Sequence, residues 1–223
     1  MAKSPKNVTI YGRLSYPTWT AQAAYESSQK SQFPAKDVAS AAPSFNVIVE
    51  QAQLDKLTKH IVDEFFPYCI AQEKAGEKRD TLDAKEVALL TEQMQTEGFE
   101  GVYNIPIRPV PEKTVELAPE GVANIRVLGN KGQDIEFQAI VNDESELAIP
   151  DPNLLSFPVL KPLGATVHDI YAGCYIAVTL NLYAYHNGKL PGFSAGAGVV
   201  VFKADGDRFG GGMNIDEDEI FAD

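Results

Sequence analysis

Residues 173–185, GCYIAVTLNLYAY, constrain the fold more than any other part of the sequence. Their side chains alternate in character. One face carries Cys174, Ile176, Val178, Leu180 and Leu182, and the other carries Tyr175, Thr179, Asn181, Tyr183 and Tyr185. A period of two predicts a long strand with one face in a hydrophobic core and one polar face. We therefore expect the chain to contain a half-buried sheet.

Weaker strand patterns occur on both sides of a helical segment. Strands are predicted at 7–17, 44–51, 124–130 and 135–141, the last two joined by a hairpin turn at 131–134. Residues 18–43 lack periodicity and are expected to form a long loop that carries Trp19. No alternation of strands and helices appears, so a small barrel or an α+β domain is favoured.

The middle of the chain, at about 53–98, has apolar residues at helical spacing. Pro67 is expected to end or kink the first helix, because proline lacks a backbone N–H group. Asp83 and Glu86 have the spacing of a capping box and should begin a second helix. This segment is interpreted as a helical insertion between strands.

Charge gives little support to a nucleic-acid partner. The formal net charge is −12, and residues 216–223 alone carry five acids and no base. Such a balance is typical of a soluble acidic protein. The sequence begins without an apolar leader and has no run of about 18 apolar residues, so a cytoplasmic protein is expected. Cys69 and Cys174 are expected to be small buried hydrophobic residues.

The polar face of residues 173–185 is the first candidate binding surface. Tyr175, Tyr183 and Tyr185 share it, and the first predicted strand offers Tyr11 and Arg13 on its own polar face. Aromatic side chains on a sheet can stack nucleic-acid bases without sequence preference. Tyrosine is also common in strands for reasons of packing alone, so both interpretations stay open.

The C-terminal tail is a second candidate. Three glycines at 210–212 precede the residues Asp216, Glu217, Asp218, Glu219, Ile220 and Phe221. The acids could find a basic patch on a partner protein while Phe221 fills an apolar pocket. A disordered tail that only improves solubility is the alternative.

Motifs for catalysis and metal binding are weak. Residues 192–196 match the G-x-S-x-G pattern of hydrolases around Ser194, but His60, His168 and His186 all precede that serine. The histidines show no metal-ligand spacing. We therefore predict no catalytic residue, no metal and no cofactor.

Four blocks of the sequence resemble the bacteriophage-encoded single-stranded-DNA-binding proteins. They are Gly12–Pro17, the stretch from Asp169 to Cys174 and Tyr175 with Tyr183–Tyr185, the glycine–serine turn at Gly192–Gly196, and Asp207–Gly212 before an acidic end. The resemblance implies a mainly β, OB-like Greek-key barrel of five to six strands. It also implies a protein that coats single strands during phage replication or recombination in the host cytoplasm, with a tail that recruits partners.

These observations lead to one prediction and two alternatives. A domain at 1–212 binds single-stranded DNA without sequence preference, and a flexible acidic tail follows at 213–223. The alternatives are a phage structural or assembly protein without nucleic-acid binding, and a hydrolase using Ser194. No membrane partner is expected, and the sequence leaves open whether the chain forms a homo-oligomer. The predicted DNA contacts are Tyr11, Arg13, Trp19, Arg126, Tyr175, Tyr183, Tyr185, Lys189 and Lys203, with Lys3 and Lys6 as weaker candidates for phosphate contacts.

Overall fold

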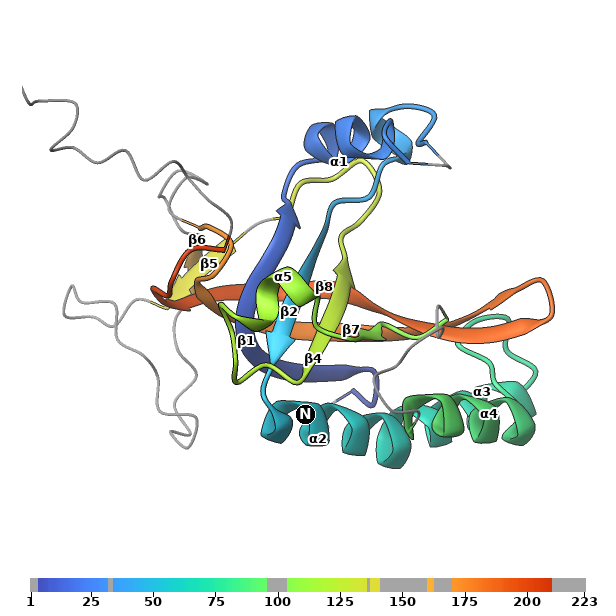
Figure 1. The fold of residues 1–223 in the computed structure, drawn as a ribbon. Helices are drawn as coiled ribbons and strands as arrows, with labels where there is room; N and C mark the ends of the chain where they lie inside the picture. Colours follow the sequence, from blue (N-terminus) through green and yellow to red (C-terminus); the bar gives the residue numbers. More distant parts are fainter. Residues whose placement is uncertain are drawn as a thin grey trace, which may run out of the picture.

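A five-stranded barrel forms the centre of the computed structural model, which describes residues 4–31, 34–95, 104–135, 137–140, 160–162 and 170–209 (Figure 1). Its strands are β1 (Asn7–Thr18), β2 (Ser44–Val49), β4 (Ala123–Leu128), β7 (Tyr175–Asn187) and β8 (Leu190–Ala204). Strand β1 lies antiparallel to β2 and β7, and β2–β4 and β7–β8 are also antiparallel pairs. A parallel pairing of β4 with β8 closes the ring. The third and fifth barrel strands thus meet in parallel, as in the OB fold, and the predicted fold class is confirmed.

Three short strands are added to this ring. Strand β3 (Ile107–Arg108) pairs with β4, while β5 (Phe137–Ile140) pairs with β8 and with β6 (Leu160–Pro162). The predicted hairpin between 124–130 and 135–141 is therefore wrong. The loop that follows β4 runs toward residues 41–43 and does not turn back along β4. Its Gly129 and Gly132 N–H groups bond to the carbonyls of Pro43 and Ala41. The next strand consequently reaches β8 and not β4.

Helices occupy three regions of the described residues. The expected loop at 18–43 instead contains α1 (Ala21–Ser28), whose first turn is capped by the Thr20 hydroxyl, and the 3-10 turn η1 (Val38–Ser40). The predicted insertion is present as α2 (Gln51–His60), the π-helical turn η2 (Ile61–Phe65), α3 (Phe66–Lys74) and α4 (Ala84–Gln95). A short helix, α5 (Glu112–Val115), lies between β3 and β4.

Two sequence signals in the insertion have different outcomes. The capping box is confirmed, because the Asp83 N–H group donates to Glu86 and the Glu86 N–H group donates to Asp83. Pro67 does not end its helix. The turn before it widens, with the Phe66 N–H group bonding to the Ile61 carbonyl, and Pro67 falls in the first turn of α3, where no N–H group is required.

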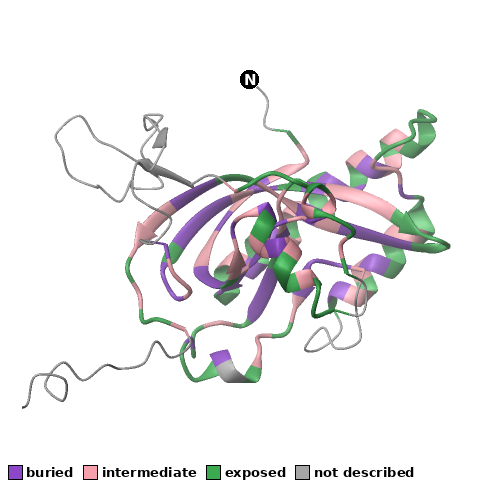
Figure 2. Cartoon of the chain, turned by 90° about the horizontal axis from the view of Figure 1, so that it is seen from above, coloured by how far each residue is buried: buried purple, intermediate pink, exposed green. Residues whose placement is uncertain are grey.

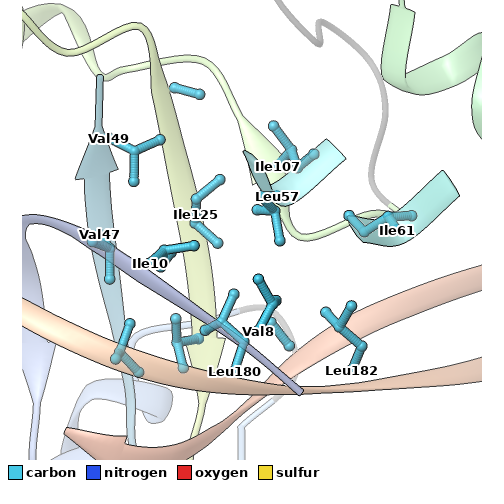
Figure 3. Close-up of a cluster of buried hydrophobic side chains, with 14 of the residues drawn as sticks. Val8, Ile10, Val47, Val49, Leu57, Ile61, Ile107, Ile125, Leu180 and Leu182 are labelled. Carbon is cyan, nitrogen blue, oxygen red and sulfur yellow. The ribbon is translucent and has the colours of Figure 1, made fainter. Parts of the chain in front are cut away.

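The hydrophobic core fills the barrel and extends to the helices below it. Inward residues of the five strands meet Leu57 and Ile61 from α2 and η2 (Figure 3). Gly12 allows β1 to bend closely over β2, since a Cβ there would lie 2.2 Å from the Ile48 carbonyl oxygen. Both cysteines are buried, as predicted, and burial raises the pKa of Cys69 to about 12 and that of Cys174 to about 11.

The β7–β8 hairpin extends beyond the barrel and runs over α3 and α4 (Figure 1). The Phe193 ring lies 6.0 Å from Phe65 and 5.6 Å from Phe66, and His186 pairs with Glu86 at 2.9 Å. Burial is concentrated on the barrel strands, and exposed residues follow the loops and the outer helix surfaces (Figure 2). The insertion thus supports the hairpin from its inner side and leaves the outer side open. Within the described segments, no helix is both long and apolar enough to cross a membrane.

Candidate nucleic-acid interface

Tyr183 and Tyr185 lie together on the outer side of β7, with ring centroids 6.5 Å apart. Their neighbours on β8 are Ser194 and Gly192. A Cβ on Gly192 would lie 2.8 Å from Cζ of Tyr185, so glycine is required for this ring to rest against β8. Burial raises the pKa of Tyr185. The pair presents two aromatic rings at the barrel exterior.

Two arginines lie beside this pair. Val127 of β4 is in register with Ala195 of β8, which places the exposed Arg126 next to Ser194. Arg108 comes from β3, and the positive charges of Arg108 and Arg126 oppose the effect of burial on the pKa of Tyr185. We call the surface formed by Tyr183, Tyr185, Gly192, Ser194, Arg126 and Arg108 the tyrosine–arginine face. It combines rings that can stack bases with cations that can contact phosphates.

Asp80 holds the backbone between the two tyrosines. Strand β1 pairs with β7 as far as Asn181, and the Leu182 N–H group bonds to the Lys6 carbonyl. Beyond these residues the Asp80 carboxylate accepts the Ala184 N–H group at 3.0 Å. Its other oxygen accepts Nζ of Lys6 at 2.6 Å. Asp80 has φ +55, a conformation that aspartate and asparagine tolerate better than most residues. The insertion thus supplies the hydrogen bond that a neighbouring strand would otherwise give.

Replacing Asp80 with alanine is expected to weaken single-strand binding several-fold, because the backbone that carries both tyrosines loses its anchor. A hydrogen bond to a charged group contributes about 1.5–3 kcal/mol to stability, so the melting temperature should fall too. Asp80→Asn keeps an acceptor for the Ala184 N–H group and should bind nearly as tightly as the wild type. Oligonucleotide titrations of all three proteins, well below their melting temperatures, test this. Equal losses in the alanine and asparagine variants would contradict it.

A second aromatic group lies further along the same outer side. Tyr11 packs on Ala177 and Val201, and the Nζ atoms of Lys56 and Lys203 each lie 5.5 Å from its ring centroid. Burial lowers the pKa of Lys203. Ala177 precedes Tyr183 by six residues, so the two aromatic groups are separated by roughly 20 Å along β7. The predicted residues Tyr11, Lys203, Tyr183, Tyr185 and Arg126 therefore share one outer side of the barrel.

Arg13 does not belong to this surface. It is only 5% exposed, and its guanidinium donates to the carbonyls of Gly173, Leu117 and Asp207. Two aromatic rings also pack against the guanidinium: Cζ of Arg13 lies 4.4 Å from the ring centroid of Phe209 and 5.4 Å from that of Tyr175. Every part of this side chain is used inside the protein. The structure therefore places Arg13, which was predicted to contact DNA, inside the protein and not on the exposed surface beside Tyr183 and Tyr185.

Trp19 also lies inside the protein. Its ring packs on Phe45 at a centroid distance of 5.5 Å, so it cannot close over a bound strand from a loop. Lys189 is exposed in the turn of the β7–β8 hairpin, and Tyr175 is exposed near the start of β7. Lys6 is committed to Asp80. Lys3 and the tail residues 216–221 lie outside the described residues.

The sequence analysis did not identify Arg108, Lys56 or Asp80. Arg108 lies in a stretch rich in proline and glycine with weak patterning, and Lys56 and Asp80 belong to the insertion. Nothing in their local spacing links them to the tyrosines, because the barrel brings them there only through long-range pairing. The described residues also contain no group of three or more histidines, cysteines or carboxylates that could hold a metal ion.

Ser194 has no hydrolase geometry. It lies in the middle of β8, whereas a nucleophile elbow needs a sharp turn from a strand into a helix. The same observation corrects the glycine–serine turn expected at 192–196, which is a regular part of the strand. The small residues there leave room for the tyrosine rings.

Comparison with known proteins finds one family that matches part of the chain. Residues 134–222 match the family described as "Enterobacter phage Enc34, ssDNA-binding protein". This stretch contains β7, which carries the two tyrosines, and β8, which carries their neighbours Gly192 and Ser194. No curated protein matches the sequence.

Solved structures of phage proteins are also similar to the chain. The single-stranded DNA-binding protein from bacteriophage Enc34 has 14% identity and a TM-score of 0.44, covering 96% of this chain and 90% of that one. Its complex with ssDNA has 14% identity and a TM-score of 0.45, with coverages of 92% and 90%. Gp2.5, a single-stranded DNA-binding protein encoded by bacteriophage T7, has 11% identity and a TM-score of 0.46, with coverages of 96% and 99%. The family match over residues 134–222 agrees with the resemblance found in the sequence and supports a relationship to the phage-encoded single-stranded-DNA-binding proteins.

Proposed function

We propose that this protein binds single-stranded DNA without sequence preference along the outer side of β7, and that it supports phage DNA replication or recombination in the host cytoplasm. The observation that carries the proposal is the tyrosine–arginine face, which lies largely within the segment that matches the family. Bases would stack on Tyr183 and Tyr185, and phosphates would be held by Arg126 and Arg108. Tyr11 with Lys56 and Lys203 would continue the path toward the start of β7.

A fluorescence anisotropy titration with labelled oligonucleotides tests this proposal. Oligo-dT and oligo-dC should bind with similar affinity, and a duplex of the same length should bind much more weakly, because its bases are stacked inside. Absence of oligo-dT binding at low salt would favour the alternative of a structural or assembly protein without nucleic-acid binding.

The affinity for single-stranded DNA should depend moderately on salt concentration. The outer side of β7 and its surroundings offer five cations, namely Arg108, Arg126, Lys56, Lys189 and Lys203. With about three to five phosphate contacts, the logarithm of affinity should fall against that of salt concentration with a slope of roughly −2 to −3.5. Arg126→Ala should make this slope shallower by about 0.7. A slope steeper than about −6 would reveal a basic groove elsewhere.

We further propose that the acidic tail recruits replication or recombination proteins. Its five acids follow a run of three glycines, a sequence from which a flexible anionic segment is expected. Such a segment competes with DNA for cations at a high effective concentration.

Deleting residues 216–223 is therefore expected to tighten DNA binding, most strongly at low salt, where charges are least screened. The same deletion should abolish capture of replication or recombination partners. Phe221→Ala should lose the partners and leave DNA affinity unchanged, because the acids remain. Anisotropy titrations and pull-downs with purified partners measure the two effects. Unchanged DNA affinity after deletion, together with intact capture by Phe221→Ala, would reduce the tail to a solubilising end.

A further inference from the structure

A second concave site lies at the other end of β7, near the turn at Gly173. We call it the Tyr16 pocket. It encloses about 340 Å³, and its walls include Ser15, Tyr16, Pro17, Thr114, Leu117 and Phe209. The buried Arg13 fixes these walls, since its guanidinium bonds to the Leu117 carbonyl and lies 4.4 Å from the Phe209 ring. The Phe209 N–H group in turn bonds to the Ala172 carbonyl at 2.8 Å. These contacts join the walls of the pocket to one another.

One polar group inside the pocket lacks a partner. Ser15 is 1% exposed, and among the described residues its hydroxyl makes no hydrogen bond. A buried hydroxyl without a partner costs free energy, which a ligand that bonds to it would recover. Apolar walls with one such group are typical of small-molecule and side-chain binding sites. The pocket thus fits an apolar or aromatic group that carries a hydrogen-bonding atom.

The rim of the pocket exposes hydrophobic residues that nothing in the described chain covers. Tyr16 is 57% exposed and has φ +45, a strained conformation for a large side chain that holds the ring at the rim. Leu117 is 39% exposed, and Val115 is exposed next to it. Exposed apolar side chains gathered around a pocket are characteristic of protein-interaction sites.

The charge around the pocket indicates the kind of partner. The segments that contribute Thr114, Leu117 and Phe209 to the pocket, residues 112–120 and 205–209, include five acids: Glu112, Glu116, Glu120, Asp205 and Asp207. Of these, Glu120 lies 3.8 Å from Arg13. The basic residues in these ranges are Lys113 and Arg208, and Arg208 lies over the Tyr171 ring at 4.1 Å. A surface with this balance repels a phosphate backbone, and it also repels the protein's own acidic tail.

We propose that the Tyr16 pocket is a docking site for a partner protein, which inserts a tryptophan or tyrosine from a basic segment. The ring would lie between Tyr16 and Phe209, and its N–H or O–H group would bond to the Ser15 hydroxyl. Tryptophan and tyrosine are the residues that most often anchor interfaces, because they combine a large apolar area with a polar atom. This site is separate from the tyrosine–arginine face and does not depend on DNA binding.

The experiment uses the full chain and three synthetic peptides: acetyl-KKWKK-amide, acetyl-KKAKK-amide and acetyl-EEWEE-amide. Binding is followed by two-dimensional NMR of the labelled protein, through the amide signals of Ser15, Leu117 and Phe209. The lysine–tryptophan peptide should shift these signals and bind at least tenfold more tightly than either of the others. Equal binding of the lysine–alanine peptide would show charge attraction alone and overturn the proposal.

Two variants locate the site. Leu117→Glu adds a charge that favours the basic peptide, so a tenfold loss of its binding, in a variant whose other amide signals and oligo-dT binding match the wild type, indicates that the pocket is blocked. Leu190→Glu, at the tip of the β7–β8 hairpin, adds the same charge at a residue that is 63% exposed and should bind normally. Ser15→Ala should weaken binding several-fold. Leu117→Glu and Ser15→Ala should bind oligo-dT like the wild type. Undiminished peptide binding by Leu117→Glu, or displacement of the peptide by oligo-dT, would refute the assignment.

Discussion

Replacing Tyr183 and Tyr185 together with alanine is expected to weaken oligo-dT binding by about 2–6 kcal/mol, because each stacked base contributes roughly 1–3 kcal/mol. The two rings lie 6.5 Å apart on the open side of β7, which allows both to take part with successive bases. Half-buried positions on an outer sheet face contribute little to the core, so the variant should stay folded. Anisotropy titrations at one fixed salt concentration measure the loss.

The matched control keeps the rings and removes only the hydroxyls. Tyr183→Phe with Tyr185→Phe should bind within a few-fold of the wild type, because stacking uses the ring faces. The salt slope of the alanine variant should also match that of the wild type, since no phosphate contact is removed. Wild-type affinity in the double alanine variant would exclude this face from the binding site.

Arg13→Ala is expected to lower the free energy of unfolding by about 3–5 kcal/mol, as is usual when one partner of a buried charged network is removed. Three backbone carbonyls would lose their donor at once, and the segments around Gly173, Leu117 and Asp207 would lose their common link. Urea unfolding followed by circular dichroism measures the change. The slope of DNA affinity against salt should stay the same.

Arg126→Ala serves as the control for Arg13→Ala, because it should affect DNA binding and not stability. This arginine is exposed on β4, so its removal should change stability by less than about 0.5 kcal/mol while weakening DNA binding. The pair of variants separates a structural arginine from a binding one. A stable Arg13→Ala protein with weakened, less salt-dependent binding would show that Arg13 does contact DNA.

The sequence predicted well those elements whose pattern is local. Residues 173–185 alternate over their whole length, and β7 has the predicted inner and outer faces. The capping box at Asp83 works within four residues and is confirmed. The hairpin after β4 was wrong, because its outcome depends on hydrogen bonds to residues near 41–43 that are far away in sequence.

The candidate site could be predicted only in part, for the same reason. The alternation of side chains along β7 placed the tyrosines on the polar face of that strand. The same alternation along β1 could not show that Arg13 is covered by Phe209 and residues near 117. Asp80 was missed for the opposite reason. It belongs to the insertion, far from β7 in sequence, yet its carboxylate accepts a hydrogen bond from the backbone of β7. Local patterns report which side of a strand a residue is on, and not what later segments place over it.

The parallel pairing of β4 with β8 also determines when the protein can first fold during synthesis. The β4–β8 pairing involves residues 195 and 196, so a nascent chain that ends before them exposes an open edge of β4 and lacks the core residues Ala195 and Val200. Contacts between segments so distant in sequence form slowly. Products of premature termination should therefore aggregate rather than accumulate as smaller folded domains. Because the same last strand underlies Tyr183 and Tyr185, such products would also lack a completed binding surface.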